Sequence, residues 1–126
     1  MLTCTREGRR MATILVVDDE EMFRTPVAEM LRRAGHVVVT ASNGVEGVAL
    51  FRSSPDRFSV ILTDLQMPEM DGYQLVNLVR ETSSRTRIIC MSGGTVKSIP
   101  ANTEFLRKPF TMSALYECVD TLLRQS

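Results

Sequence analysis

A set of polar residues in this sequence carries the side chains that phosphoryl transfer needs, and each member stands where an apolar run ends or just beyond one. In chain order they are Asp18, Asp19, Asp64, Ser92 and Lys108. Taken one at a time they have ordinary explanations, because Asp is a favoured helix cap and turn residue and most lysines are solvated surface charges. Together they are informative, since carboxylates gathered in one pocket raise one another's pKa unless a cation joins them.

Magnesium is the cation that such a pocket favours. Mg²⁺ prefers oxygen ligands and is usually held by one or two carboxylates together with a phosphate. In that setting the carboxylate of Asp64 is a nucleophile able to form an acyl phosphate. Lys108 supplies a positive charge for the phosphoryl oxygens, and Ser92 supplies a hydroxyl donor. The residue types thus predict a phosphoryl-transfer site whose catalytic side chains are Asp64, Ser92 and Lys108.

The elements that must bring these residues together are alternating strands and helices. Short β-branched runs indicate buried parallel strands, and stretches of helical period separate them. The predicted strands are Ile14–Val17, His36–Thr40, Ser59–Thr63, Arg87–Met91 and Glu104–Leu106, and the predicted helices are Glu20–Ala34, Asn43–Ser53, Tyr73–Thr82 and Thr111–Arg124. The expected fold class is α/β, a doubly wound, flavodoxin-like parallel sheet of these five strands. With strand order 2-1-3-4-5, the polar residues converge beyond the carboxyl ends of the strands.

The connection between the fourth and fifth predicted strands falls short of a full helix. Residues 93–103 barely reach the length that a crossover with its helix needs. Gly93 and Gly94 are poor helix formers, and Pro100 forbids helix continuation and pushes Ile99 toward extended geometry. The sequence therefore predicts a shortened or irregular fourth helix of one turn at most.

Composition limits the classes of function. The chain has 126 residues, the usual size of one domain, and 15 basic and 15 acidic side chains that balance to a net charge of zero. No overall basic field favours nucleic acid, and no apolar run approaches the roughly 20 residues that span a bilayer. The three separated cysteines and the lone His36 are expected to be structural. We therefore expect a cytoplasmic protein that binds neither nucleic acid nor membrane directly.

The chain divides into a short polar segment and one domain. Residues 1–10 have no periodicity and are predicted to be a disordered tail, whereas residues 11–126 are predicted to form the domain. Both Met1 and Met11 stay open as the functional start. The chain is either a protein of its own or a piece of a longer regulator or hybrid kinase.

The motifs resemble those of response-regulator receiver domains, the CheY-like domains of two-component signal transduction. The resembling stretches run in order from about Thr13 to Leu123 and comprise Val16-Val17-Asp18-Asp19-Glu20, Asp64 with Met67-Pro68, Met70-Asp71-Gly72, Ser92-Gly93 and Lys108-Pro109-Phe110. The resemblance implies a phosphoprotein that accepts a phosphoryl group from a sensor histidine kinase, or from a histidine phosphotransfer protein in a phosphorelay. It implies a signalling domain with self-phosphorylation and self-dephosphorylation activity, not an enzyme, acting on a downstream effector that the sequence does not name.

The resemblance also gives single residues their roles, with Asp64 as the phosphorylated residue. The implied magnesium ligands are Asp18 through water, Asp19, Asp64 and the backbone carbonyl of Gln66; the switch residues are Ser92 and Phe105; and the cis proline is Pro109. In the family, the fourth helix, the fifth strand and the last helix form the face that commonly dimerises or binds targets. A shortened fourth helix therefore predicts a monomer or a weak dimer.

Two other functions stay open at this stage. An aspartate-nucleophile phosphatase of the haloacid dehalogenase type also uses a strand-end Asp, magnesium and a lysine, but it places a second Asp where this chain has Gln66. A pseudo-receiver would keep the fold as a binding module without phosphorylation, and the full set of site residues argues against it. Nucleotide-binding folds are disfavoured, since no Walker loop or Gly-x-Gly-x-x-Gly turn follows the first strand.

Overall fold

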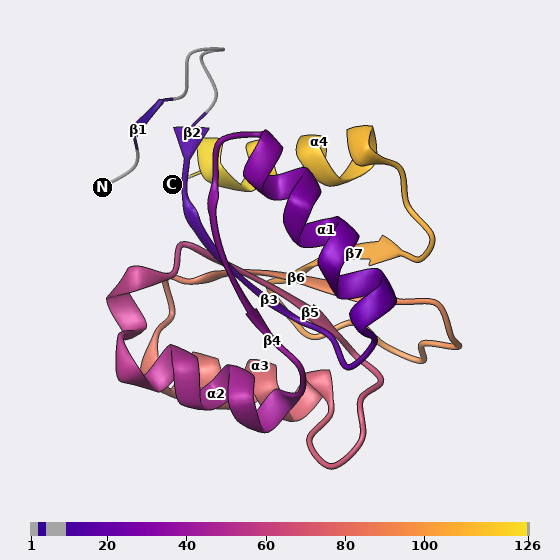
Figure 1. Cartoon of the computed structure of the whole chain (residues 1–126). Coiled ribbons are helices and arrows are strands. Elements are labelled where there is room, and N and C mark those ends of the chain that lie inside the picture. Colours follow the sequence, from indigo (N-terminus) through magenta and orange to yellow (C-terminus); the bar gives the residue numbers. More distant parts are fainter. Residues whose placement is uncertain (1–2, 5–9, 126) are drawn as a thin grey trace.

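The structure, a computed structural model, describes residues 3–4 and 10–125 (Figure 1). In chain order its elements are β1 (Thr3–Cys4), β2 (Arg10–Met11), β3 (Thr13–Val17), α1 (Glu21–Arg33), β4 (Val37–Ala41), α2 (Gly44–Ser53), the 3₁₀ turn η1 (Pro55–Arg57), β5 (Val60–Asp64), α3 (Gly72–Thr82), β6 (Arg87–Ser92), β7 (Glu104–Arg107) and α4 (Met112–Arg124). The alternation of strand and helix that the sequence predicts is therefore present from β3 to α4.

The central sheet has five parallel strands in the order β4-β3-β5-β6-β7. Because β3 is the first of these strands along the chain, this order is 2-1-3-4-5, and the predicted flavodoxin-like topology is confirmed. Every residue of β5 is buried. Such burial on both faces explains why β3 and β5, in the middle of the sheet, are nearly continuous apolar runs without a polar alternation.

Helices cover the two faces of the sheet in pairs. Figure 1 shows α1 and α4 on one face and α2 and α3 on the other. The first core lies under α1 and α4, where Leu31 and Leu115 are buried against Val16 of β3. The second core lies under α2 and α3, where Phe51 and Leu75 are buried. This division into two cores fixes β3 and β5 in the middle of the molecule, with the ends of both strands at one edge.

Local capping sets where the helices begin. Glu20 has an extended backbone (φ −95°, ψ 106°) and is the N-cap of α1, so this helix begins one residue later than predicted. α3 begins at Gly72 because Asp71 and Gln74 form a capping box, in which Asp71 accepts a hydrogen bond from the Gln74 backbone N–H at 2.9 Å. Each of these helices follows, after one turn or loop, a strand that ends at the predicted site, β3 for α1 and β5 for α3.

Residues 93–103 form an irregular loop without a helix, which confirms the prediction for this connection. Two long side chains of α3 hold the loop. The hydroxyl of Tyr73 donates to the carbonyl oxygen of Ser98 at 2.7 Å, and the guanidinium of Arg80 donates to that of Asn102 at 3.0 Å. Asn102 has φ 60°, a left-handed conformation that Asn tolerates better than most residues.

Outside the central sheet, β1 pairs with β2 in an antiparallel two-residue ladder. Of the predicted disordered tail, residues 1–10, most positions lie outside the described residues, and this expectation stays a prediction. In the described ranges 3–4 and 10–125, no helix is long and apolar enough to cross a membrane. The cytoplasmic location also stays a prediction.

Three of the residues expected to be structural, His36, Cys90 and Cys118, lie inside the fold, whereas the side chain of Cys4 is outside the described part of the chain. His36 is buried, and its Nδ1 accepts a hydrogen bond from the Ala12 backbone N–H at 3.1 Å. Cys90 is a buried free thiol and Cys118 a half-buried one. Burial raises the pKa of both thiols, that of Cys118 to about 11. These positions fit a packing role, because a thiol with a raised pKa is a poor nucleophile.

Candidate functional site

Lys108 lies at the centre of the site. Its Nζ is 2.7 Å from Oδ2 of Asp18 and 2.8 Å from Oδ2 of Asp64. The exposed fractions of the three side chains are 10%, 0% and 6%, in the order Lys108, Asp18, Asp64. In a site so nearly enclosed, charges are screened little by water and must neutralise one another. One ammonium therefore serves as the counterion of two carboxylates that come from different strands.

Backbone N–H groups orient the two buried carboxylates. Oδ1 of Asp18 accepts from the N–H of Glu20 at 2.9 Å, and Oδ1 of Asp64 accepts from the N–H of Gln66 at 3.0 Å. In both, the chain turns immediately after its strand, so an aspartate at the strand end can bind the backbone two residues on. Each carboxylate thus uses one oxygen for its own loop and presents the other to Lys108.

The start of α3 packs tightly against the end of β5. A Cβ added at Gly72 would lie 2.3 Å from the carbonyl oxygen of Asp64 and 2.7 Å from the Cα of Leu65. Both neighbours are backbone atoms, which cannot turn away as a side chain can. Glycine at this position therefore allows the helix to approach the loop that carries Asp64.

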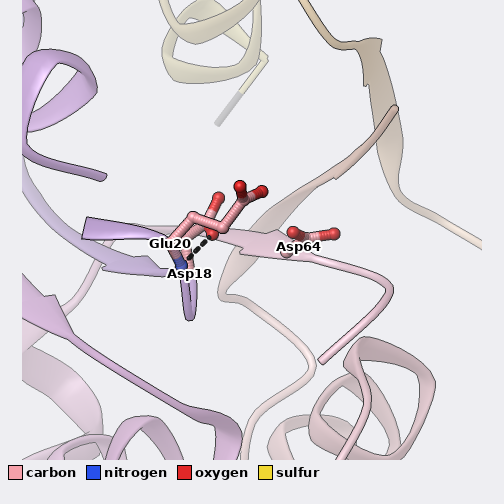
Figure 2. Close-up of side chains that lie close together, drawn as sticks. All are labelled: Asp18, Glu20 and Asp64. Atoms are coloured by element: carbon pink, nitrogen blue, oxygen red, sulfur yellow. Dashed lines mark hydrogen bonds between the residues drawn. The ribbon is translucent and has the colours of Figure 1, made fainter. Parts of the chain in front are cut away.

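A third carboxylate completes an acidic group at this edge of the sheet. Figure 2 shows Asp18, Glu20 and Asp64, whose ligand oxygens lie within 4.8 Å of one another and could hold a metal ion. Asp19, which the resemblance makes a direct ligand, is exposed and is not a member of this group. Sequence reasoning assigned no metal role to Glu20, although this acid directly follows the Asp18-Asp19 pair. The direct role of Asp19 stays a prediction.

Burial and neighbouring charges shift the pKa values of Asp64 and Lys108. Burial raises the pKa of Asp64, and the hydrogen bonds from Lys108 and from the Gln66 N–H lower it only in part. Burial by itself would lower the pKa of Lys108, but hydrogen bonds to Asp18 and Asp64 outweigh it and raise that pKa. Lys108 is therefore a permanent cation at neutral pH, and the ionised form of Asp64 is held at a cost in free energy.

Ser92, the predicted hydroxyl donor, is fully buried at the end of β6. Its Oγ donates to Oε1 of Gln66 and accepts from the N–H of Gly94 at 3.0 Å. The carbonyl oxygen of Ser92 accepts from the Lys108 N–H at 2.9 Å, which ties the end of β6 to the segment after β7. Ser92 thus lies beside the acidic group, with its hydroxyl directed to Gln66 and Gly94.

The remaining two predicted positions lie along β7 and just after it. Phe105 is half-buried and packs against the second core, and the guanidinium carbon of Arg107 lies 5.3 Å from the centre of its ring. The Lys108–Pro109 peptide bond is cis, as the resemblance implies. The structure therefore brings Asp18, Asp64 and Lys108 into direct contact, places Gln66 and Ser92 beside them, and leaves Phe105 on the neighbouring strand.

Residues 14–120 match the family model described as the response regulator receiver domain. The chain belongs to the response-regulator receiver family. Curated relatives agree with this assignment. The sequence is 31% identical over 120 residues to the sensor kinase CckA of Brucella abortus, covering 90% of this chain and 13% of the relative. It is 31% identical over 125 residues to the transcriptional regulatory protein GlrR of Escherichia coli, covering 94% of this chain and 28% of that relative. This receiver chain thus spans less than a third of either relative.

Solved structures of receivers have the same fold. A receiver domain protein from Clostridium thermocellum superposes with a TM-score of 0.83 at 26% identity, covering 90% of this chain and 95% of that one. The chemotaxis response regulator CheY4 of Vibrio cholerae superposes with a TM-score of 0.79 at 32% identity, covering 89% of this chain and 98% of that one. Because these matches cover nearly all of both chains, the receiver fold accounts for almost the whole of this structure.

Proposed function

We propose that Asp64 accepts a phosphoryl group from a sensor histidine kinase, or from a histidine phosphotransfer protein, in a magnesium-dependent reaction. The resulting change of conformation controls a downstream effector. Family membership makes the chain a signalling domain. The observation that supports phosphorylation of this chain is the Lys108 ammonium bridging the buried carboxylates of Asp18 and Asp64.

The transfer starts from the carboxylate of Asp64. One of its oxygens attacks the phosphorus of the phosphohistidine, so that an O–P bond forms while the N–P bond breaks and the imidazole nitrogen keeps the electron pair. The product is an acyl phosphate. Because burial already disfavours the ionised form of Asp64, the carboxylate is a more reactive nucleophile than a solvated one. Later attack by water on the phosphorus releases inorganic phosphate and restores Asp64.

Lys108 neutralises the charge that the phosphoryl group brings. Its Nζ already lies 2.8 Å from Oδ2 of Asp64. A phosphoryl group on that carboxylate places its oxygens within reach of the same ammonium. A preorganised cation of this kind acts on the transition state without moving, which makes it more effective than solvent.

The donor set fits a magnesium ion. Mg²⁺ prefers oxygen ligands and is usually held by carboxylates. The carboxylate oxygens of Asp18, Glu20 and Asp64 lie within 4.8 Å of one another, so these three residues could hold one ion together. When bound, the ion supplies positive charge to the phosphoryl oxygens. Asp18, Glu20 and Asp64 would hold it, and the resemblance adds Asp19 and the carbonyl of Gln66.

Ser92 connects the phosphoryl group to the rest of the fold. Its hydroxyl is bonded to Gln66 in the unphosphorylated chain. In our proposal this hydroxyl turns to a phosphoryl oxygen, and Phe105 on the adjacent strand changes its packing in response. Because Gly94 is bonded to the same Oγ, the movement would be passed to residues 93–103.

A direct test is to incubate the purified chain with acetyl phosphate and Mg²⁺ and to measure its intact mass. We expect one added phosphoryl group, lost in Asp64→Asn and retained in Asp56→Asn, an exposed aspartate of η1. A chelator should slow the reaction severely. Equal labelling of Asp64→Asn would refute the assignment, and absence of labelling in every variant would favour a pseudo-receiver.

A further inference from the structure

An aromatic ring from α1 lies against the Lys108 ammonium. Phe23, in the first turn of α1, lies with the centre of its ring 4.2 Å from Nζ. A lysine ammonium within about 6 Å of the face of an aromatic ring is attracted by its quadrupole, and the attraction is larger where water is excluded. The side chain of Lys108 is only 10% exposed, so this contact belongs to the stronger kind.

The partners of the ammonium differ in what the proposed reaction does to them. In the proposed reaction Asp64 would become an acyl phosphate, and Asp18 would help to hold Mg²⁺. Glu20, at 4.0 Å from Nζ, belongs to the same acidic group. The ring of Phe23 carries no charge and takes no ligand. It is therefore the partner of Lys108 that stays the same before, during and after phosphoryl transfer.

The ring itself is held in place. Phe23 packs edge to face on Phe110, with ring centres 5.4 Å apart and an interplanar angle of 89°. Both rings pack against the first hydrophobic core. Phe110 lies two residues after Lys108, so one short segment carries the ammonium and also supports the ring that faces it. Such packing restricts the ring to one orientation.

We infer that Phe23 is a positioning residue, whose ring keeps the Lys108 ammonium beside Asp64 when the carboxylates exchange their charge partners. The inference rests on the proposed phosphorylation of Asp64. A lysine side chain has a flexible four-carbon stem, so without a constant partner its ammonium would spread over several positions once Asp18 binds a metal. An aromatic ring prevents this and adds no charge that would compete with the phosphoryl group for the lysine.

The first test is the rate of phosphorylation by acetyl phosphate at saturating Mg²⁺. Phe23→Leu should lower the rate by up to about 30-fold, the factor that corresponds to the roughly 2 kcal/mol of a desolvated cation–π contact. Phe23→Tyr and Phe23→Trp keep a ring face and should stay within about twofold of the parent. A rate for Phe23→Leu equal to the parent rate, or rates for Phe23→Tyr and Phe23→Trp as low as that of Phe23→Leu, would overturn the inference.

The second test needs neither phosphodonor nor metal. Urea unfolding of Phe23→Leu, Lys108→Met and the double variant forms a cycle that isolates the contact between the two side chains. We expect a smaller combined loss of stability than the sum of the single losses. The matched cycle of Phe51→Leu with Lys108→Met removes a ring of the second core, away from the ammonium, and should be additive. If Phe23→Leu does not fold, Phe23→Met serves in both experiments.

The two tests separate the inference from the function on which it rests. Failure of the parent chain to accept phosphate would refute the proposed function, while the unfolding cycle would still report whether the ring and the ammonium are coupled. An additive Phe23 cycle together with normal phosphorylation of the parent would refute the positioning role alone.

Discussion

The carboxyl edge of the sheet and the loop of residues 93–103 are neighbouring regions that are stabilised by different interactions. At the edge, Asp18, Asp64 and Lys108 come from three separate segments and are almost completely enclosed. The loop is mostly exposed, has no helix, and is tied to α3 by Tyr73 and Arg80 through its backbone carbonyls. One region is held by charges that must compensate each other, and the other by a few hydrogen bonds at its surface.

This difference separates two parts of a receiver. The proposed phosphoryl chemistry depends on the closed edge, and there the chain carries all of the expected residue types. The transmission of the signal depends in the family on the face that includes the fourth helix, and here that helix is replaced by the loop. Substitutions at the edge should therefore affect chemistry strongly, whereas substitutions in the loop should have small effects on both stability and phosphorylation.

The largest effect should come from Lys108. Lys108→Met should lower the rate of phosphorylation by acetyl phosphate by about 100-fold or more, because a preorganised charge at the reacting group is lost. Lys97→Met, an exposed lysine of the loop, is the matched control and should leave the rate unchanged within about twofold. A comparable loss in both variants would show that general charge, and not the buried ammonium, matters.

Substitutions of two glycines test whether the chain is packed more tightly at the carboxyl edge of the sheet than in the loop. Gly72→Ala should lower the free energy of unfolding by about 1–3 kcal/mol, because the new Cβ meets backbone atoms that have no room to move. At Gly93, where the loop begins, a Cβ would have its nearest neighbour at 3.5 Å, an ordinary contact. Gly93→Ala should therefore be close to neutral in urea unfolding. Equal destabilisation of both variants would contradict the contrast.

The acid that sequence reasoning passed over can be tested through metal affinity. Glu20→Gln should weaken Mg²⁺ binding about three- to tenfold, because one charged oxygen near the ion is replaced by a neutral amide. Glu21→Gln is the control, since Glu21 is also exposed but lies outside the acidic group. Titration by isothermal calorimetry would measure both, and Asp19→Asn in the same series would test the direct role that the resemblance gives to Asp19.

The smallest expected effect concerns self-association. Beryllofluoride, which mimics the phosphoryl group on Asp64, should not produce a stable dimer through the face that contains residues 93–103, because a loop offers less apolar area to bury than a helix. Light scattering at increasing protein concentration measures this. A beryllofluoride-dependent dimer that disappears when this loop is mutated would show that the loop replaces the helix as an interface.

The sequence by itself determined the order of the elements along the chain. The β-branched runs of β3 and β5 indicate a sheet covered on both faces, and two stretches between them have helical period. It also determined that residues 93–103 lack a helix, because Gly93, Gly94 and Pro100 act locally on the backbone. These features depend on the conformational preferences of single residues or of neighbours along the chain, so they can be inferred without any tertiary contact.

Only the tertiary structure decided how the site residues meet. That Lys108 bridges Asp18 and Asp64, that Glu20 and not Asp19 joins the acidic group, and that Phe23 faces the ammonium all depend on side-chain directions at the ends of three strands and one helix. Sequence spacing fixes which residues arrive at the edge of the sheet. Which of these residues touch is set by how the helices and strands pack in the two cores. Asp18 and Lys108 are 90 residues apart along the chain, so their contact cannot be inferred from local sequence.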